Sequence, residues 1–246
     1  MAAAMARGWA GADGFDGELL FTDGGSGRAA AIAKEVGGRT APDNGALAAD
    51  ADLVVLAVKP AHLGPVITGL TVPGKPILSV LGATSLAVLA KALPTLPLAR
   101  VMPNLAVENR QGVLCYDAGD EVDKKLDARL KELLGLLGTV IEVDDSQIDA
   151  ATAVMGCSPA YVALVAETLI EGAVREGIDP DLARRMVVET VAGTGALLRE
   201  HAPEDVRRAV ASPGGSTEAG LRVLEKKKFR KMLQRAIDAS LEKMRG

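Results

Sequence analysis

Residues 53–60 read LVVLAVKP. The first six are apolar without any alternation of apolar and polar positions, which predicts a strand that is covered on both faces. Lys59 and Pro60 close the run, and a proline both stops a strand and suits the first position of a helix. We therefore expect a parallel strand inside a sheet that has helices on both sides.

Similar short apolar runs recur on either side of this stretch, and helical patterns separate them. Such an alternation of strands and helices is typical of a doubly wound, Rossmann-like fold. The further strands are predicted at residues 19–22, 77–80, 99–102, 113–116 and 139–143. The first 145 residues therefore predict a dinucleotide-binding α/β domain, 1–145.

The rest of the chain, residues 146–246, shows no strand pattern and predicts an all-helical domain. Ser158 and Asp179 each precede a proline, as helix N-caps often do, and Gly177 lies where a helix should end. Between Tyr161 and Gly172, apolar residues recur every three or four positions, which predicts a helix buried against another helix or subunit.

The composition excludes several classes of function. The 28 basic and 32 acidic residues give a net charge of −4, and the chain has only six aromatic residues. Nucleic-acid binding needs clustered basic residues and often aromatic stacking, so we expect no nucleic-acid partner. We interpret the basic run at residues 226–231 as a solvated helix face or the rim of a subunit interface.

The number and spacing of the two cysteines bear on whether the protein has disulfides or a zinc site. Cys115 and Cys157 are 42 residues apart and form no metal-binding pattern with His62 or His201, so neither a zinc site nor a disulfide framework is expected. Cys157 fits small-residue packing better than a nucleophile.

Isolated Glu, Gly and Pro residues break every apolar run, and the amino-terminal residues lack a signal-peptide pattern. We expect a cytoplasmic protein with no membrane span.

A glycine-rich segment, DGGSGR at residues 23–28, follows the first predicted strand. At this place in a dinucleotide-binding fold, a carboxylate such as Asp23 would bind the ribose diol of NAD, whereas Ser26 and Arg28 would accept the extra phosphate of NADP. Both signals are present, so both cofactors stay open. The alternative is a connection that binds no ligand.

Two other strand ends carry polar residues, namely Lys59 and the RVMPN segment at residues 100–104. Ligands bind beyond the carboxyl ends of parallel strands, although either segment alone also fits an ordinary exit from a strand.

The SPGGST segment at residues 212–217 is the sharpest pattern. Gly214 and Gly215 allow backbone N–H groups to converge, and a helix is predicted from about Glu218. Such a nest at a helix start binds a carboxylate or phosphate. The alternative is a plain capped loop.

Four segments in this order, LAVKP at 56–60, RVMPN at 100–104, GCSPAY at 156–161 and SPGGST at 212–217, closely resemble the pyrroline-5-carboxylate reductase family over nearly the whole chain. The resemblance implies reduction of 1-pyrroline-5-carboxylate to L-proline, the last step of proline synthesis, with hydride from NADPH or NADH. It also implies a homodimer or a larger homo-oligomer built by the helical half.

The resemblance implies a set of site residues. Those for the adenosine end of the cofactor are Ser26, Arg28 and Asn44. Those beside the nicotinamide ribose are Ala57, Lys59 and Pro60, and those of the loop under the nicotinamide are Met102, Pro103 and Asn104. Those of the substrate carboxylate nest are Ser212, Gly214, Gly215, Ser216 and Thr217. Thr217 would hydrogen-bond the ring nitrogen, while Glu200 would favour the cationic imine. No metal is implied.

The chain departs from the family at its start, because residues 1–8 resemble the helix that follows the family's first strand and glycine-rich turn. We expect a start placed too far downstream, a gap between the neighbours of the absent central strand, and weak cofactor binding. A non-catalytic dimerisation module is therefore one alternative. The other is a related reductase of the imine reductase or β-hydroxyacid dehydrogenase type, but the helix predicted at 159–176 lacks the lysine that the β-hydroxyacid enzymes use.

Overall fold

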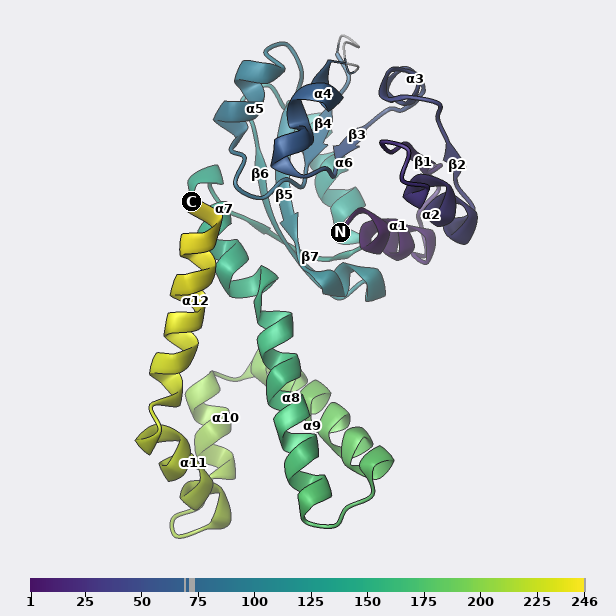
Figure 1. Cartoon of the computed structure of the whole chain (residues 1–246). Helices are drawn as coiled ribbons and strands as arrows, with labels where there is room; N and C mark the ends of the chain where they lie inside the picture. The colour runs from purple at the N-terminus through teal and green to yellow at the C-terminus, as the bar shows by residue number, and fades with distance from the viewer. Residues whose placement is uncertain (69, 71–73, 246) are drawn as a thin grey trace. The chain divides into compact units, whose positions relative to one another are not determined.

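The computed structural model of this protein describes residues 1–68, 70 and 74–245 (Figure 1). The chain forms two compact units. Unit 1 comprises Met1–Cys157 together with the chain from Leu241 onward, and unit 2 comprises Ser158–Ser240. By their contacts, residues 146–157 group with unit 1. The boundary predicted after residue 145 stays a prediction.

Unit 1 contains a five-stranded sheet with the order β3-β4-β5-β6-β7. Its strands are β3 (Val54–Leu56), β4 (Ile77–Ser79), β5 (Leu98–Pro103), β6 (Gly112–Ala118) and β7 (Gly138–Glu142). β3, β4 and β5 are parallel, and β7 is parallel to β6. The sheet is not wholly parallel, because β6 runs antiparallel to β5. The short connection through η2 (Leu105–Asn109) leaves no room for a crossover helix.

A second, two-stranded parallel sheet joins β1 (Leu20–Phe21) to β2 (Arg39–Thr40). β2 was not predicted. β1 and β3 are not hydrogen-bonded to each other, so the strand order is interrupted between them. This is the place where the sequence led us to expect a gap.

Both faces of the five-stranded sheet are covered, as the apolar run at 53–58 predicts. Val54 and Leu56 point into one core with α3 (Asn44–Asp50), α4 (Leu63–Ile67) and α5 (Leu86–Ala92). Val55, between them, faces a second core with α1 (Ala2–Ala10) and α6 (Lys124–Gly135). This alternation follows from the period of two in a strand, and it confirms the doubly wound architecture.

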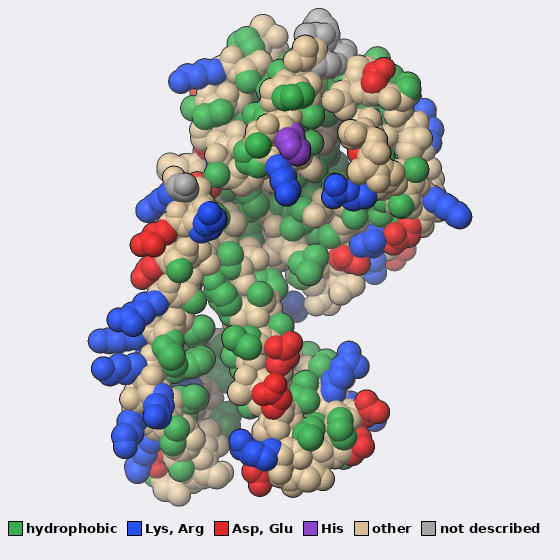
Figure 2. Space-filling view, in the orientation of Figure 1, with side chains coloured by type: hydrophobic (Ala, Val, Ile, Leu, Met, Phe, Trp, Pro, Cys, Tyr) green, Lys and Arg blue, Asp and Glu red, His purple; other side chains and the backbone are tan. Residues whose placement is uncertain are grey.

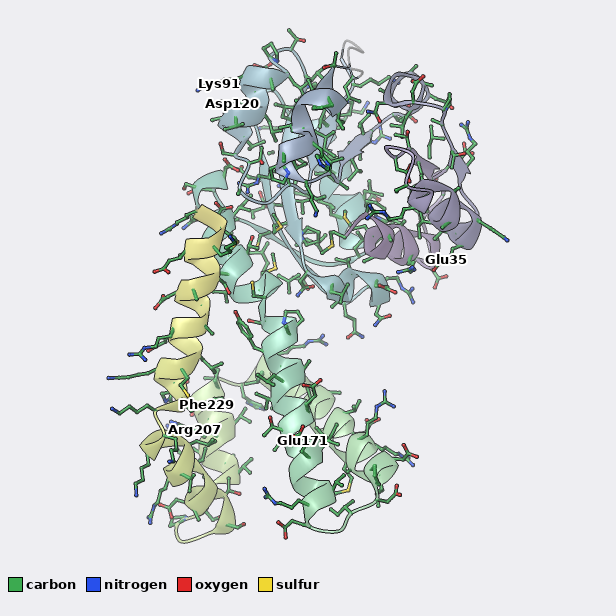
Figure 3. All side chains as sticks on the ribbon, in the orientation of Figure 1. Glu35, Lys91, Asp120, Glu171, Arg207 and Phe229 are labelled. Atoms are coloured by element: carbon green, nitrogen blue, oxygen red, sulfur yellow. The ribbon has the colours of Figure 1, made fainter. Side chains whose placement is uncertain are left out.

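α2 (Arg28–Val36) packs beside α1. Figure 3 labels Glu35 at this place, where its carboxylate pairs with the guanidinium of Arg7. The pair is exposed, so it contributes little to stability.

A buried ion-pair network fixes the start of α7 (Asp145–Ala151) against the sheet. Arg100, on β5, is 2% exposed and donates to Asp145 at 2.8 Å and to Asp149 at 2.9 Å. The backbone N–H of Asp145 in turn donates to Asp117 of β6 at 2.6 Å. Burial is the main cause that raises the pKa of Asp117. A π-helical turn, η3 (Thr152–Gly156), continues α7.

Among its described residues, unit 2 contains helices and short connections and no strand, as predicted. Its helices are α8 (Ser158–Arg175), α9 (Pro180–Glu200), α10 (Pro203–Val210), α11 (Ser216–Lys226) and the part of α12 (Phe229–Arg245) up to Ser240. Asp179 caps α9 through its carboxylate, and Gly177 follows α8 with φ +88°, so these two predicted helix signals are confirmed. The third, an N-cap at Ser158, is wrong, because Ser158 lies within the continuous helix Asp145–Arg175. The helix predicted from about Glu218 begins two residues earlier, at Ser216, with Gly215 as its N-cap.

Unit 2 exposes a large amount of apolar surface on α8. Leu164 is 61% exposed and Leu169 is 51% exposed, and Val162 and Val165 are exposed beside them. The stripe predicted between Tyr161 and Gly172 is therefore present, and it is not covered within the single chain. Exposed apolar areas of this kind mark interaction surfaces.

Within the described residues, one helix meets the length and composition of a membrane span, which the interrupted apolar runs of the sequence did not indicate. It is the continuous helix Asp145–Arg175. The sequence argument counted uninterrupted apolar runs, whereas the mean over a helix stays apolar despite an isolated Glu or Gly. Almost none of the most apolar part of this helix is buried. Exposed apolar surfaces of this kind also occur where one protein chain binds another.

Candidate functional site

The predicted nicotinamide-side residues gather at one edge of the five-stranded sheet. β3, β4 and β5 are parallel and Leu56, Ser79 and Arg100 are in register, so their carboxyl ends lie at the same edge. Ala57, Lys59 and Pro60 follow β3 and are exposed, with Pro60 at the first position of η1 (Pro60–His62). Met102, Pro103 and Asn104 close β5 and are buried.

Asn104 has a structural task that sequence reasoning missed. Its side-chain oxygen accepts from the N–H of Val113 at 3.1 Å, and its Nδ2 donates to the carbonyl of Met155 at 3.3 Å. Asn104 is 8% exposed, and the first bond ties it to β6 while the second ties it to η3. It therefore fixes the loop under the predicted nicotinamide position. The sequence did not predict this role, because the π-helical turn that contains Met155 leaves no pattern in the sequence.

The predicted adenosine-side residues Ser26 and Arg28 are in direct contact, since Arg28 Nε donates to Ser26 Oγ at 3.1 Å. Asp23 organises the loop before them. Its two carboxylate oxygens accept from the N–H groups of Gly25, Ser26 and Ala29 and from the Ser26 hydroxyl, at 2.8 to 3.1 Å. These bonds, the one from Ala29 first, lower the pKa of Asp23 to about 2. Asp23 is therefore engaged within its own loop, while the Arg28 side chain is exposed at the start of α2.

Asn44 lies at the corresponding end of β2. It is the first residue of α3 and is partly buried, and Asp43 before it caps the helix by accepting from the N–H of Ala46. Because β1 and β2 are parallel, the segment that carries Ser26 and Arg28 and the start of α3 follow the same edge of their sheet.

The SPGGST segment forms a tight turn that opens α11. The N–H of Gly215 donates to the carbonyl of Ser212 at 3.0 Å, and Gly214 has φ +74°, a conformation that favours glycine. Ser216 and Thr217 form the first helical positions, and N–H groups in a first turn have no partner within the helix. The Gly214 N–H is already bound, because it donates to Glu218 Oε2 at 2.7 Å.

Two side chains complete the predicted substrate site within unit 2. Thr217 is exposed on the first turn of α11, and Glu200 is the exposed last residue of α9. Their roles stay predictions.

The cysteines and the basic run are the other reactive or charged groups that the sequence pointed to. Cys115 and Cys157 are free, and burial raises the pKa of the Cys115 thiol, which disfavours a thiolate there. Among the described residues, no three His, Cys, Asp or Glu side chains are placed to share a metal ion. The basic side chains of residues 226–231 are mostly exposed, and Figure 2 shows Lys and Arg side chains along α12.

Two protein-family models match the chain. Residues 145–246 match the model described as pyrroline-5-carboxylate reductase dimerisation. Residues 1–82 match the model described as NADP oxidoreductase coenzyme F420-dependent. Together they cover the helical half and the first part of the α/β half.

Known proteins match nearly the whole length. A pyrroline-5-carboxylate reductase from Synechocystis sp. is 35% identical over 206 residues, which cover 82% of this chain and 77% of that protein. The solved 1-pyrroline-5-carboxylate reductase from Streptococcus pyogenes is 30% identical, with a TM-score of 0.89 over 100% of this chain and 94% of the other. A pyrroline carboxylate reductase from Plasmodium falciparum, solved with NADP bound, is 26% identical, with a TM-score of 0.88 over 99% of this chain and 92% of the other. Identity at this level over four fifths of the sequence shows that this chain belongs to the pyrroline-5-carboxylate reductase family.

Proposed function

We propose that this protein reduces 1-pyrroline-5-carboxylate to L-proline with NADPH, the final step of proline synthesis. The observation that carries the proposal is the turn at residues 212–217, whose two glycines present backbone N–H groups at the start of α11. A small carboxylic acid is the chemistry that such a turn recognises. Membership of the family supplies the reaction class.

The α/β half would hold the cofactor, which supplies the hydride when bound. The contact between Ser26 and Arg28 offers a hydroxyl and a guanidinium to a phosphate, while the engagement of Asp23 with its own loop removes the usual acceptor for a ribose diol. The residues present therefore fit NADP, which the relative from Plasmodium falciparum binds. Asn44 would contact the adenine side. The residues at the nicotinamide end would be Ala57, Lys59, Pro60, Met102, Pro103 and Asn104.

The helical half would hold the substrate. Its carboxylate would accept hydrogen bonds from the turn formed by Ser212, Gly214, Gly215, Ser216 and Thr217. Thr217 would hydrogen-bond the ring nitrogen, and Glu200 would stabilise the cationic imine. Hydride adds to the imine carbon, the electron pair of the C=N bond moves to nitrogen, and the nitrogen keeps its proton. A protonated imine accepts hydride readily, so these residues would mainly position and polarise the substrate.

The domain spanning residues 146–246 would also form the subunit interface. It matches the family's dimerisation model and exposes apolar side chains on α8. A homodimer or a larger homo-oligomer is the expected assembly. Soluble substrates and two free cysteines suit a cytoplasmic location.

The direct test is to follow NADPH consumption by the purified protein with 1-pyrroline-5-carboxylate, with L-proline quantified as the product and NADH compared as the donor. We expect stoichiometric proline and a preference for NADPH. Binding of NADPH without proline formation would favour another imine reductase. Absence of NADPH binding in a fluorescence titration would favour a dimerisation module without catalysis.

A further inference from the structure

The backbone N–H of Gly214, which the proposed function assigns to the substrate, already donates to the carboxylate of Glu218. Glu218 Oε2 accepts from the backbone N–H of Gly214 at 2.7 Å, inside the turn expected to bind the substrate's carboxylate. The other oxygen, Oε1, accepts from Arg222 Nη2 at 2.9 Å, one helical turn further along α11. Both Glu218 oxygens thus have a partner.

This bond differs from the usual capping box at a helix start. Glu218 is the third residue after the N-cap Gly215, the position from which a Glu commonly reaches back to the N–H of the N-cap residue itself. Here it reaches one residue further, to Gly214. A Cβ built on Gly214 would meet no atom within 4 Å, so the turn is open on the Cα side of Gly214. Gly214 is also exposed, so a ligand can approach the turn from solvent.

Two carboxylates cannot share this single N–H without strong repulsion between their charges. We propose that Glu218 is a specificity-determining residue, whose carboxylate occupies the Gly214 N–H in the free protein and must leave when the carboxylate of the imino acid binds. This inference rests on the proposed function. Arg222 is 74% exposed in its side chain and retains Glu218 as an ion-pair partner after the exchange. The competition weakens binding of carboxylate substrates and leaves uncharged cyclic imines unaffected.

The test compares Glu218→Gln with the wild type on two substrates that differ only in the carboxylate, namely 1-pyrroline-5-carboxylate and the unsubstituted cyclic imine, 1-pyrroline. For the variant, we expect the KM for the carboxylate substrate to fall about three- to tenfold, the size of one net hydrogen bond. The kcat of the variant and its KM for the unsubstituted imine should stay within twofold of the wild type. The matched control is Glu225→Gln, which removes the same charge two turns along the same helix and should change neither KM.

Two further variants separate competition from a merely structural role. Glu218→Asp keeps the charge, but its side chain is one methylene shorter and should not reach the Gly214 N–H. It should therefore also lower the KM for the carboxylate substrate. This second variant keeps the test valid if the Gln variant misfolds. Arg222→Gln should raise that KM in the wild-type background and have no effect beside Glu218→Gln, because Arg222 acts through Glu218. An unchanged or raised KM in both Glu218 variants, or an equal fall for both substrates, overturns the inference.

A binding measurement separates failure of this inference from failure of the proposed function. Titration of L-proline, observed through the amide resonance of Gly214, should reach its midpoint at a lower concentration in Glu218→Gln than in the wild type. If the wild type reduces no imine yet this midpoint shifts, the proposed function fails and the competition stands. If the wild type is active and neither KM nor midpoint shifts, the competition fails and the function stands.

Discussion

Asp23 lies in the loop where we expected a carboxylate to discriminate between cofactors, but its four hydrogen bonds hold the loop itself together. Because these bonds hold its pKa near 2 in the folded protein, below the value of about 4 for an unfolded aspartate, the bonds stabilise the fold above pH 4. That stabilisation is lost as the pH falls toward 2. Asp23→Asn should therefore lower Tm at pH 7, with a difference that shrinks as the solution is acidified. Thermal melts by circular dichroism at pH 7 and pH 3 measure it, with the exposed Asp13→Asn as control. An equal difference at both pH values would contradict this account.

Arg28 carries the preference for a phosphorylated cofactor in our proposal. Its guanidinium is exposed beside the Ser26 hydroxyl, so loss of the charge should weaken NADPH binding about tenfold or more and leave NADH binding unchanged. The measurement is the dissociation constant of each cofactor for Arg28→Ala. Lys34→Ala, on the same helix, is the matched control. Equal losses for both cofactors would place Arg28 outside the 2′-phosphate site.

Thr217 is the proposed hydrogen-bonding partner of the substrate ring nitrogen. Thr217→Ala should raise KM and lower kcat, with a combined loss of about tenfold or more in kcat/KM. Thr217→Ser retains the hydroxyl and should stay close to the wild type. Steady-state kinetics of the three proteins decide the matter, and wild-type kinetics in the Ala variant would refute the role.

Among the elements, α7 depends most on a single side chain. Arg100 is buried and pairs with Asp145 and Asp149, so its removal leaves two partly buried carboxylates without a cation. Arg100→Met should lower the free energy of unfolding of unit 1 by about 3 kcal/mol. Urea unfolding can be followed through Trp9, the only tryptophan in the chain, which is buried in unit 1. Arg100→Lys keeps one charge and should lose less. An unchanged midpoint in the Met variant would show that the network adds nothing to stability.

The strands that the sequence predicts are those with buried apolar runs, such as residues 53–58, because burial on both faces leaves a visible pattern. β2 escaped prediction since it consists of two exposed residues, Arg39 and Thr40, with no such pattern. The antiparallel direction of β6 escaped as well, because periodicity does not record direction. Pairing and direction are decided by contacts between segments that are distant in sequence.

The candidate site shows the same division. The glycines of residues 212–217 predicted a turn at a helix start, because the backbone conformation of such a turn favours glycine. The bonds of Asn104 to Met155 and of Glu218 to Gly214 were not foreseen, since each depends on how two segments meet in space. The choice between NAD and NADP stayed open because Asp23 and Arg28 are both present in the sequence. The hydrogen bonds that engage Asp23 within its own loop are visible only in the structure.

For the whole molecule, the exposed apolar side of α8 predicts association. Leu169 is 51% exposed on that helix, so a charge there should prevent the burial of its neighbours in a subunit interface. Leu169→Glu should sediment as a monomer in analytical ultracentrifugation while the wild type sediments as a dimer or larger. Val88→Glu, an equally exposed change on α5 of unit 1, should retain the wild-type assembly. A Leu169→Glu protein that sediments like the wild type would place the interface elsewhere.

The phenol of Tyr161 reaches Ser240 at 2.7 Å, which joins the first turn of α8 to the middle of α12. These two residues lie close to the places where the chain enters and leaves unit 2. A segment whose ends nearly meet loses little conformational entropy when it is closed on itself. The helical unit is therefore inserted into the chain with its two ends close together, the arrangement that lets one domain be accommodated within another without distorting either.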